Sequence, residues 1–142
     1  MRIALFLSLL FFSLYASSDV AKTLGYYSDY EQALAVAEIE EKPLMLVVVT
    51  SYCPWCRKFE RKTLASKAVA STIKEDYIAV IVDRNKDAES FPKIYQTPRI
   101  PTVYFIDSKT KKQYWQSVGY LNKMDFEEAL DDAQKLYDSL DK

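Results

Sequence analysis

The 142-residue sequence predicts one α/β domain in which a central mixed sheet is flanked by helices. Two apolar runs, residues 44–49 and 77–83, have the length and β-branched content of strands buried on both faces. Segments with helical spacing alternate with these runs, and two further strands, 102–106 and 113–118, are joined by a short turn. The length suits a single hydrophobic core, so no second domain is expected.

The first 18 residues have the pattern of a secretory signal peptide. Arg2 precedes a mostly apolar run, residues 3–16, that is too short to span a bilayer, and small residues follow at 16–18. We expect cleavage after Ser18, which leaves 19–142 as a single domain in the periplasm or outside the cell. An uncleaved signal anchor is the alternative.

Charge and cysteine content exclude several classes of function. Loss of Arg2 leaves 18 basic residues against 20 acidic ones, a formal charge of −2, so nothing indicates a nucleic-acid partner. The chain has two cysteines, Cys53 and Cys56, whose spacing closes too small a loop to stabilise a fold. Their function is the better explanation for the pair, and no cofactor is expected.

The other elements follow from apolar periodicity and from turn residues. A helix over 29–41 precedes the first strand, and a helix from Pro54 to about Leu64 follows it. In chain order the sequence then predicts a helix over 67–75, a loop over 84–89, a short helix near Tyr95 and the turn 107–112. Asn122 is the predicted N-cap of a last helix. The apolar stripe of that helix consists of Phe126, Ala129, Leu130, Ala133, Leu136, Tyr137 and Leu140.

The Cys53-Pro54-Trp55-Cys56 segment has the pattern of a redox-active dithiol. Pro54 suits the first position of a helix, which makes Cys53 the helix N-cap. The helix dipole and the unpaired amides of the first turn favour a thiolate there, so we expect a lowered pKa for Cys53. Cys56 lies within one turn and faces the interior. It can therefore close a disulfide with Cys53 after Cys53 has attacked a substrate.

Metal binding and haem attachment are the alternatives for a CxxC segment. Two thiolates make half of a tetrahedral zinc site, and the chain has no His and no third Cys to complete one. Covalent haem attachment needs His after the second cysteine, where this chain has Arg57. We therefore expect no metal ligands.

Three separated segments carry a family resemblance: Cys53-Pro54-Trp55-Cys56 after a strand, Arg99-Ile100-Pro101-Thr102 before the third strand, and Val118-Gly119 before the last helix. With them, residues 28–140 resemble the thioredoxin superfamily. The resemblance implies a thioredoxin-like fold, a cis Pro101 against the CxxC segment, and substrate backbone paired beside Ile100. Residues 42–60 look most like the C-terminal periplasmic domain of the membrane thiol-disulfide interchange protein.

That resemblance implies a thiol-disulfide oxidoreductase that reduces protein disulfides with electrons from a membrane partner. A thioredoxin-fold binding module or chaperone with an idle dithiol is the alternative. Pro101 could also be an ordinary trans proline that opens a strand. Tyr52 and Trp55 are either exposed substrate contacts or packing over the core.

The sequence departs from the superfamily at Val47, where a buried Asp usually helps to move the proton of the second cysteine. Glu60, one helical turn beyond Cys56, is the candidate replacement, with solvent as the alternative. Most glutamates on helices are solvated, so Glu60 could equally be a surface residue.

Overall fold

The computed structural model describes residues 17–140. Residues 1–16, which make up most of the predicted signal peptide, lie outside the described residues, as do residues 141–142. The predicted cleavage point after Ser18 falls in the first turn of helix α1, Ser17–Leu24.

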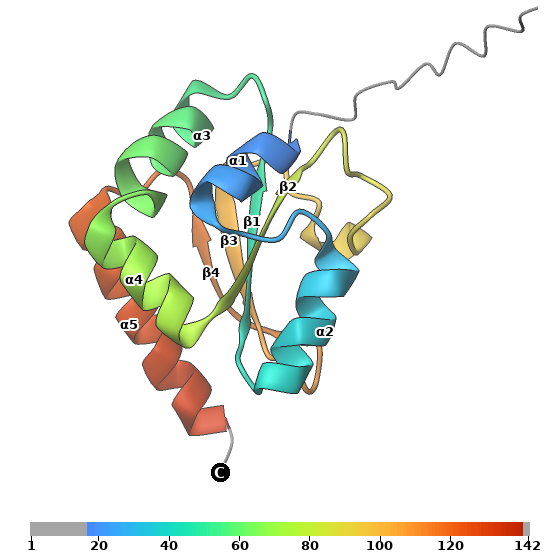
Figure 1. The fold of residues 1–142 in the computed structure, drawn as a ribbon, viewed down its shortest axis with the longest axis vertical. Coiled ribbons are helices and arrows are strands. Elements are labelled where there is room, and N and C mark those ends of the chain that lie inside the picture. The colour runs from blue at the N-terminus through green and yellow to red at the C-terminus, as the bar shows by residue number, and fades with distance from the viewer. Residues whose placement is uncertain (1–16, 141–142) are drawn as a thin grey trace, which may run out of the picture.

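Helices and strands alternate along the chain much as the sequence predicts (Figure 1). After α1 the elements are α2 (Tyr30–Glu40), β1 (Leu44–Val49), α3 (Pro54–Lys58), the π-helix η1 (Phe59–Leu64), α4 (Lys67–Asp76), β2 (Ile78–Asp83), the 3₁₀-helix η2 (Lys93–Tyr95), β3 (Thr102–Ile106), β4 (Gln113–Val118) and α5 (Lys123–Leu140).

The four strands form one mixed sheet in the order β2-β1-β3-β4. β1 pairs parallel with β2 and antiparallel with β3, and β3 pairs antiparallel with β4. All six residues of β1 are buried, as expected for a central strand covered on both faces. The predicted fold class is confirmed.

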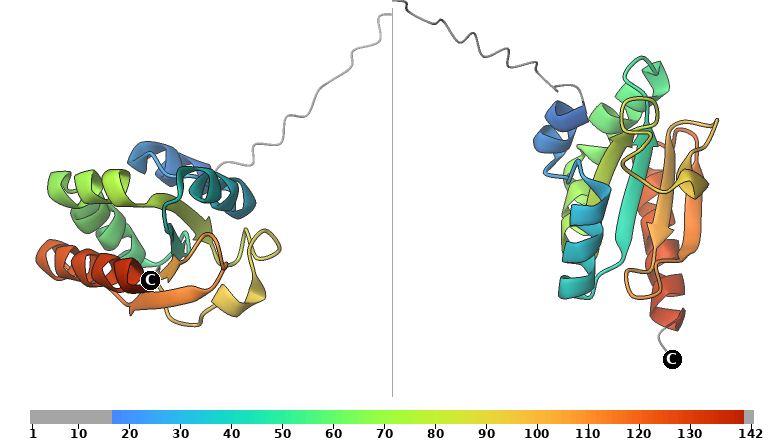
Figure 2. Two further views of the ribbon diagram at one scale, coloured as in Figure 1. Left: turned by 90° about the horizontal axis from the view of Figure 1, so that it is seen from below. Right: turned by 90° about the vertical axis from the view of Figure 1, so that its right-hand side faces the viewer.

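Helices cover both faces of the sheet: α3, α4 and α5 lie on one side and α2 lies on the other (Figure 2). We call the first side, on which α1 also packs, the dithiol face, because its core includes Cys56 with Phe59, Phe105 and Phe126. The second side is the α2 face, whose core joins Ala33 and Leu34 to Leu46 and Tyr104. Alternate residues of β1 point to opposite faces, so Val47 belongs to the dithiol face and Val48 to the α2 face.

Three local expectations differ from the structure. Helix α1 was not predicted, because its apolar residues are few and its stability depends on packing against the sheet, where Ala21 is buried. Residues 59–64 form a π-helix, which apolar spacing alone does not distinguish from an α-helix. Leu136 and Leu140, predicted in the buried stripe of α5, are 37% and 52% exposed.

Candidate active site

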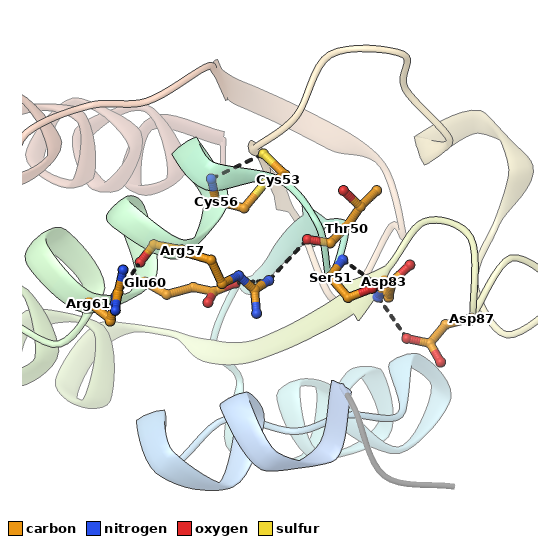
Figure 3. A network of polar contacts seen from close by, with 9 residues as sticks. All are labelled: Thr50, Ser51, Cys53, Cys56, Arg57, Glu60, Arg61, Asp83 and Asp87. Carbon is orange, nitrogen blue, oxygen red and sulfur yellow. Dashed lines mark hydrogen bonds and ion pairs between the residues drawn. The ribbon is translucent and has the colours of Figure 1, made fainter.

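The two cysteines occupy the start of α3, at the carboxyl end of β1 (Figure 3). Cys53 is the N-cap, Pro54 takes the first helical position, and the backbone N–H of Cys56 donates to Cys53 Sγ at 3.1 Å. Cys53 is partly exposed, whereas Cys56 is completely buried, and both are thiols in this structure. The local geometry is the one that the spacing predicts.

Burial controls the chemistry of the inner thiol. Burial, together with a side-chain hydrogen bond to Cys53, raises the pKa of Cys56 to about 12, while a backbone hydrogen bond with Thr50 acts in the opposite direction. Cys56 is therefore a neutral thiol at physiological pH. Any reaction in which its sulfur attacks needs a group that takes its proton.

Pro101 lies beside the dithiol because β1 and β3 run antiparallel. Val48 pairs with Thr102, which places Pro101 at the carboxyl end of β1, and the Ile100–Pro101 bond is cis. The N–H of Gly119 donates to the Pro101 carbonyl at 2.8 Å, from a backbone with a φ of 90° that favours glycine. The three separated segments that carried the resemblance therefore meet at one end of the sheet.

Aromatic side chains line the surface beside Cys53. Tyr52 and Trp55 are 72% and 56% exposed, so neither packs over the core as a buried lid. The Asn85 amide donates to the Tyr52 hydroxyl, and the ring of Trp55 lies 5.4 Å from that of Tyr120. Ile100 is partly buried against the cores of both faces.

Lys58 and Tyr120 were not singled out from the sequence, yet they complete this aromatic surface. The Lys58 ammonium lies 4.6 Å from the centre of the Tyr120 ring and 5.0 Å from that of Trp55. It is thus a cation–π partner of both rings. In the sequence, Lys58 could have been identified only by its i,i+3 spacing from Trp55. Tyr120 could have been identified by its position directly after Val118-Gly119.

Glu60 lies on η1, which directly follows α3, and is only 4% exposed. The alternative of a solvated surface residue is therefore wrong. Burial raises its pKa to about 7, although the charges of Arg57 and Arg61 act to lower it. Arg57 Nη2 lies 2.7 Å from Glu60 Oε1, and the same nitrogen donates to the Thr50 carbonyl at 3.1 Å. Glu60 can therefore change its protonation state near neutral pH.

Asp83, at the end of β2, holds the loop that leads into the dithiol. It accepts hydrogen bonds from the backbone N–H groups of Ser51 (2.8 Å), Asn85 (2.9 Å) and Lys86 (3.1 Å), while Asp87 accepts from the N–H of Asp83 at 2.7 Å. Sequence reasoning missed this residue. A carboxylate at the carboxyl end of a strand next to β1 was the signal that could have identified it.

Fold and site together define a thioredoxin-like protein. Residues 30–134 match the family model described as "Thioredoxin-like domain", and the chain belongs to this family.

The chain is also similar to a known protein over about half of its own length, and to solved structures in its fold. Human spermatogenesis-associated protein 20 is 30% identical over 74 residues, which are 52% of this chain and 9% of that protein. The structure called "DsbH Oxidoreductase" superposes with a TM-score of 0.67 at 22% identity, covering 78% of this chain and 84% of that one. The oxidised C-terminal domain of DsbD from Neisseria meningitidis gives a TM-score of 0.60 at 19% identity, covering 76% and 98%. At these identities the two structures show the shared fold.

Within residues 17–140, no helix is both long enough and apolar enough to cross a bilayer.

Proposed function

We propose that this chain is an exported thiol-disulfide oxidoreductase that reduces protein disulfides through Cys53 and Cys56. The observation that carries the proposal is the pairing of a partly exposed thiol at a helix N-terminus with a buried thiol one turn away, beside a cis proline. The N–H of Cys56 and the first-turn dipole stabilise negative charge on Cys53 Sγ. The names "DsbH Oxidoreductase" and "disulphide isomerase" among proteins of the same fold support this class of reaction.

The reaction transfers two electrons from the dithiol to the substrate. The Cys53 thiolate attacks one sulfur of the substrate disulfide, forms a mixed disulfide and releases the other substrate sulfur as a thiolate. Cys56 then gives up its proton and attacks Cys53 Sγ. This step forms the Cys53–Cys56 disulfide and releases the second substrate thiolate. A membrane dithiol partner would restore the reduced form by the reverse exchange.

Glu60 is our candidate for the base that takes the Cys56 proton. Its carboxyl is buried one helical turn beyond Cys56, and the two groups interact electrostatically. A pKa of about 7 leaves a large fraction of Glu60 ionised at neutral pH, so the carboxylate can accept a proton there. Val47, which stands where the superfamily usually has an acid, cannot serve.

Tyr52, Trp55 and Ile100 are our candidate substrate contacts. Both aromatic rings are exposed, and Ile100 precedes Pro101 just before the start of β3, where an extended substrate segment could pair with the backbone. Trp55→Ala and Tyr52→Ala should then raise KM for a protein disulfide more than for a small one such as oxidised glutathione. Equal effects on both substrates would contradict the assignment.

Reductive turnover of insulin disulfides tests the proposal. Wild type should catalyse it, and Cys53→Ser should abolish it. If wild type reduces insulin no faster than Cys53→Ser does, the protein is instead a binding module with an idle dithiol. The reduction potential then decides the direction, because about −270 mV marks a thioredoxin-like reductant and about −120 mV a strong oxidant.

The role of Glu60 has its own test in the resolution step. Stopped-flow decay of the mixed disulfide, followed from about pH 6 to 9, should slow in Glu60→Gln, while the first attack by Cys53 stays nearly unchanged. A general base contributes about 100-fold, and solvent access could reduce this to a few-fold. Glu75 has an exposed carboxyl on α4, so Glu75→Gln is the matched control. Identical decay in wild type and Glu60→Gln would show that water carries the proton.

A further inference from the structure

The Arg57 side chain connects two groups close to the dithiol, the Thr50 carbonyl and the Glu60 carboxyl. Its Nη2 atom lies 3.1 Å from the Thr50 carbonyl oxygen and 2.7 Å from Glu60 Oε1 (Figure 3). One nitrogen thus joins the end of the β1 segment to the buried carboxyl. Arg57 directly follows Cys56, so the same helical turn holds the thiol and the bridge.

Thr50 is also a neighbour of both cysteines. Its backbone forms a hydrogen bond with the Cys56 thiol, and its carbonyl accepts from the Cys53 N–H at 3.4 Å as well as from Arg57. A change at Arg57 therefore acts on Glu60 and on the peptide that contacts the dithiol. The guanidinium geometry suits such a bridge, because its N–H donors are held in a rigid plane.

Other charged groups near Glu60, on η1, β2 and α1, are less well placed to hold it. Arg61, on η1, is exposed, and its Nε donates to the Arg57 carbonyl at 3.3 Å. Asp83, at the end of β2, is occupied by three backbone N–H groups. Asp19, on α1, is exposed and of like charge. Of the two arginines whose charges lower the Glu60 pKa, Arg57 is therefore the one in direct contact with the carboxylate.

Two hollows meet at the Arg57–Glu60 pair. An inner cavity of about 10 Å³ lies towards the end of the sheet, and an open groove of about 310 Å³ lies beneath α1. Arg57 and Glu60 line both of them, together with Val20. The inner cavity also has Ser51 and Asp83 in its wall, and the groove has Thr23 and Ala65. The pair thus lies between the inner cavity and the groove.

We propose that Arg57 is a positioning residue that fixes the Glu60 carboxylate in place and thereby sets the pH above which the mixed disulfide is resolved. This inference rests on the proposed role of Glu60 as base. Without the guanidinium, the desolvation of the buried carboxyl has no close compensating charge. Glu60 then keeps its proton to a higher pH and accepts the Cys56 proton only there.

The experiment compares Arg57→Met, Arg57→Lys and Arg61→Met with wild type by two measurements. The titration of the Glu60 carboxyl is followed by ¹³C NMR in the reduced protein, and mixed-disulfide decay is followed across the same pH range. Arg57→Met should raise both midpoints by about one pH unit or more, the range expected for loss of a close opposite charge. Arg57→Lys keeps the charge without the planar donors and should give a smaller shift. Arg61→Met, the matched control, should shift both midpoints by less than half as much.

The two measurements separate the ways in which the inference could fail. An unshifted Glu60 midpoint in Arg57→Met, with a rate that still depends on Glu60, would overturn the role of Arg57 alone. A shifted Glu60 midpoint with an unshifted rate profile would overturn Glu60 as the base and the inference with it. If Arg57→Met does not fold, the same comparison is made between Arg57→Lys and Arg61→Met, and equal shifts in those two would contradict the proposal.

Discussion

The two faces of the sheet are packed with different chemistry. The dithiol face combines a phenylalanine cluster with a buried thiol, Cys56, and the buried carboxyl of Glu60 lies under the same helices. Among residues 17–140, the core of the α2 face consists of aliphatic side chains, Phe91 and tyrosines, and no buried thiol or carboxyl belongs to it. β1 serves both, since its alternate residues enter the two cores. The comparison suggests that the α2 face supports the fold, while the dithiol face accepts ionisable groups at a cost in stability.

The largest expected difference lies within the dithiol face itself, between the alkylation rates of the partly exposed Cys53 and the buried Cys56. Only the thiolate reacts with iodoacetamide, and a pKa of about 12 leaves about 10⁻⁵ of Cys56 ionised near pH 7. Cys53 should therefore be alkylated at least about 1,000-fold faster than Cys56. Mass mapping after brief labelling of the reduced protein measures the ratio. Preferential labelling of Cys56 would reverse the assignment of attacking and resolving thiols.

Leu46→Ala tests the supporting role of the α2 face. The side chain is completely buried there, so truncation should lower the free energy of unfolding by about 2–5 kcal/mol. Urea titration measures this loss. The NMR titration of Glu60 and the alkylation rate of Cys53 should stay at their wild-type values. A shifted Glu60 midpoint in a folded Leu46→Ala protein would show that the two faces are not independent.

Glu60 should make the dithiol face less stable as the pH rises. Its folded pKa of about 7 exceeds the value of 4.5 for an unperturbed carboxyl, so between these pH values the unfolded chain releases a proton that the folded protein keeps. Stability contributed by protonated Glu60 is thus complete below about pH 4.5 and lost by about pH 7, a change of about 3 kcal/mol.

Glu60→Gln removes this pH dependence. The stability of Glu60→Gln relative to wild type should therefore rise by about 3 kcal/mol between about pH 4.5 and pH 8 in urea titrations. Glu75→Gln, on the exposed side of α4, should show no such trend. Parallel pH profiles for wild type and Glu60→Gln would contradict a raised pKa.

Val47→Ala and Val48→Ala give the smallest and most direct comparison of the faces. These neighbours on β1 are both completely buried, so each change should cost about 2 kcal/mol in unfolding free energy. Only Val47 shares a core with Cys56. Only Val47→Ala should therefore change the rate of Cys56 alkylation in a Cys53→Ser background. Equal rates in the two variants would show that packing at Val47 does not control access to Cys56.

Much of the fold could be predicted because its signals are local. The continuous apolar run of β1 and the two runs around the turn 107–112 have the same limits in the sequence and in the structure. Cys53 and Pro54 also fix the start of α3 by their own chemistry. α1 lacked such a signal, because an eight-residue helix with few apolar positions is stable only when it packs on the sheet.

The site could be predicted only where a residue type by itself indicates the chemistry of the site. Two cysteines, a proline before a strand and a glutamate one turn on are visible in the sequence. The burial of Glu60 is not visible, because it depends on how η1, the helix that contains Glu60, packs in the folded protein. Arg57 gave no signal either, since a basic residue on a helix is ordinary until Thr50 and Glu60 are seen beside it.

The antiparallel pairing of β1 with β3 also affects how the site comes into existence. Cys53 and Cys56 are local in sequence, whereas Pro101 reaches them only after the distant pair Val48 and Thr102 has formed. Contacts between residues far apart along the chain form late, so the cysteines become neighbours before the site is complete. The sequence has two cysteines, which allow a single intramolecular disulfide. A chain that folds in an oxidising compartment therefore has no incorrect intramolecular pairing to undo.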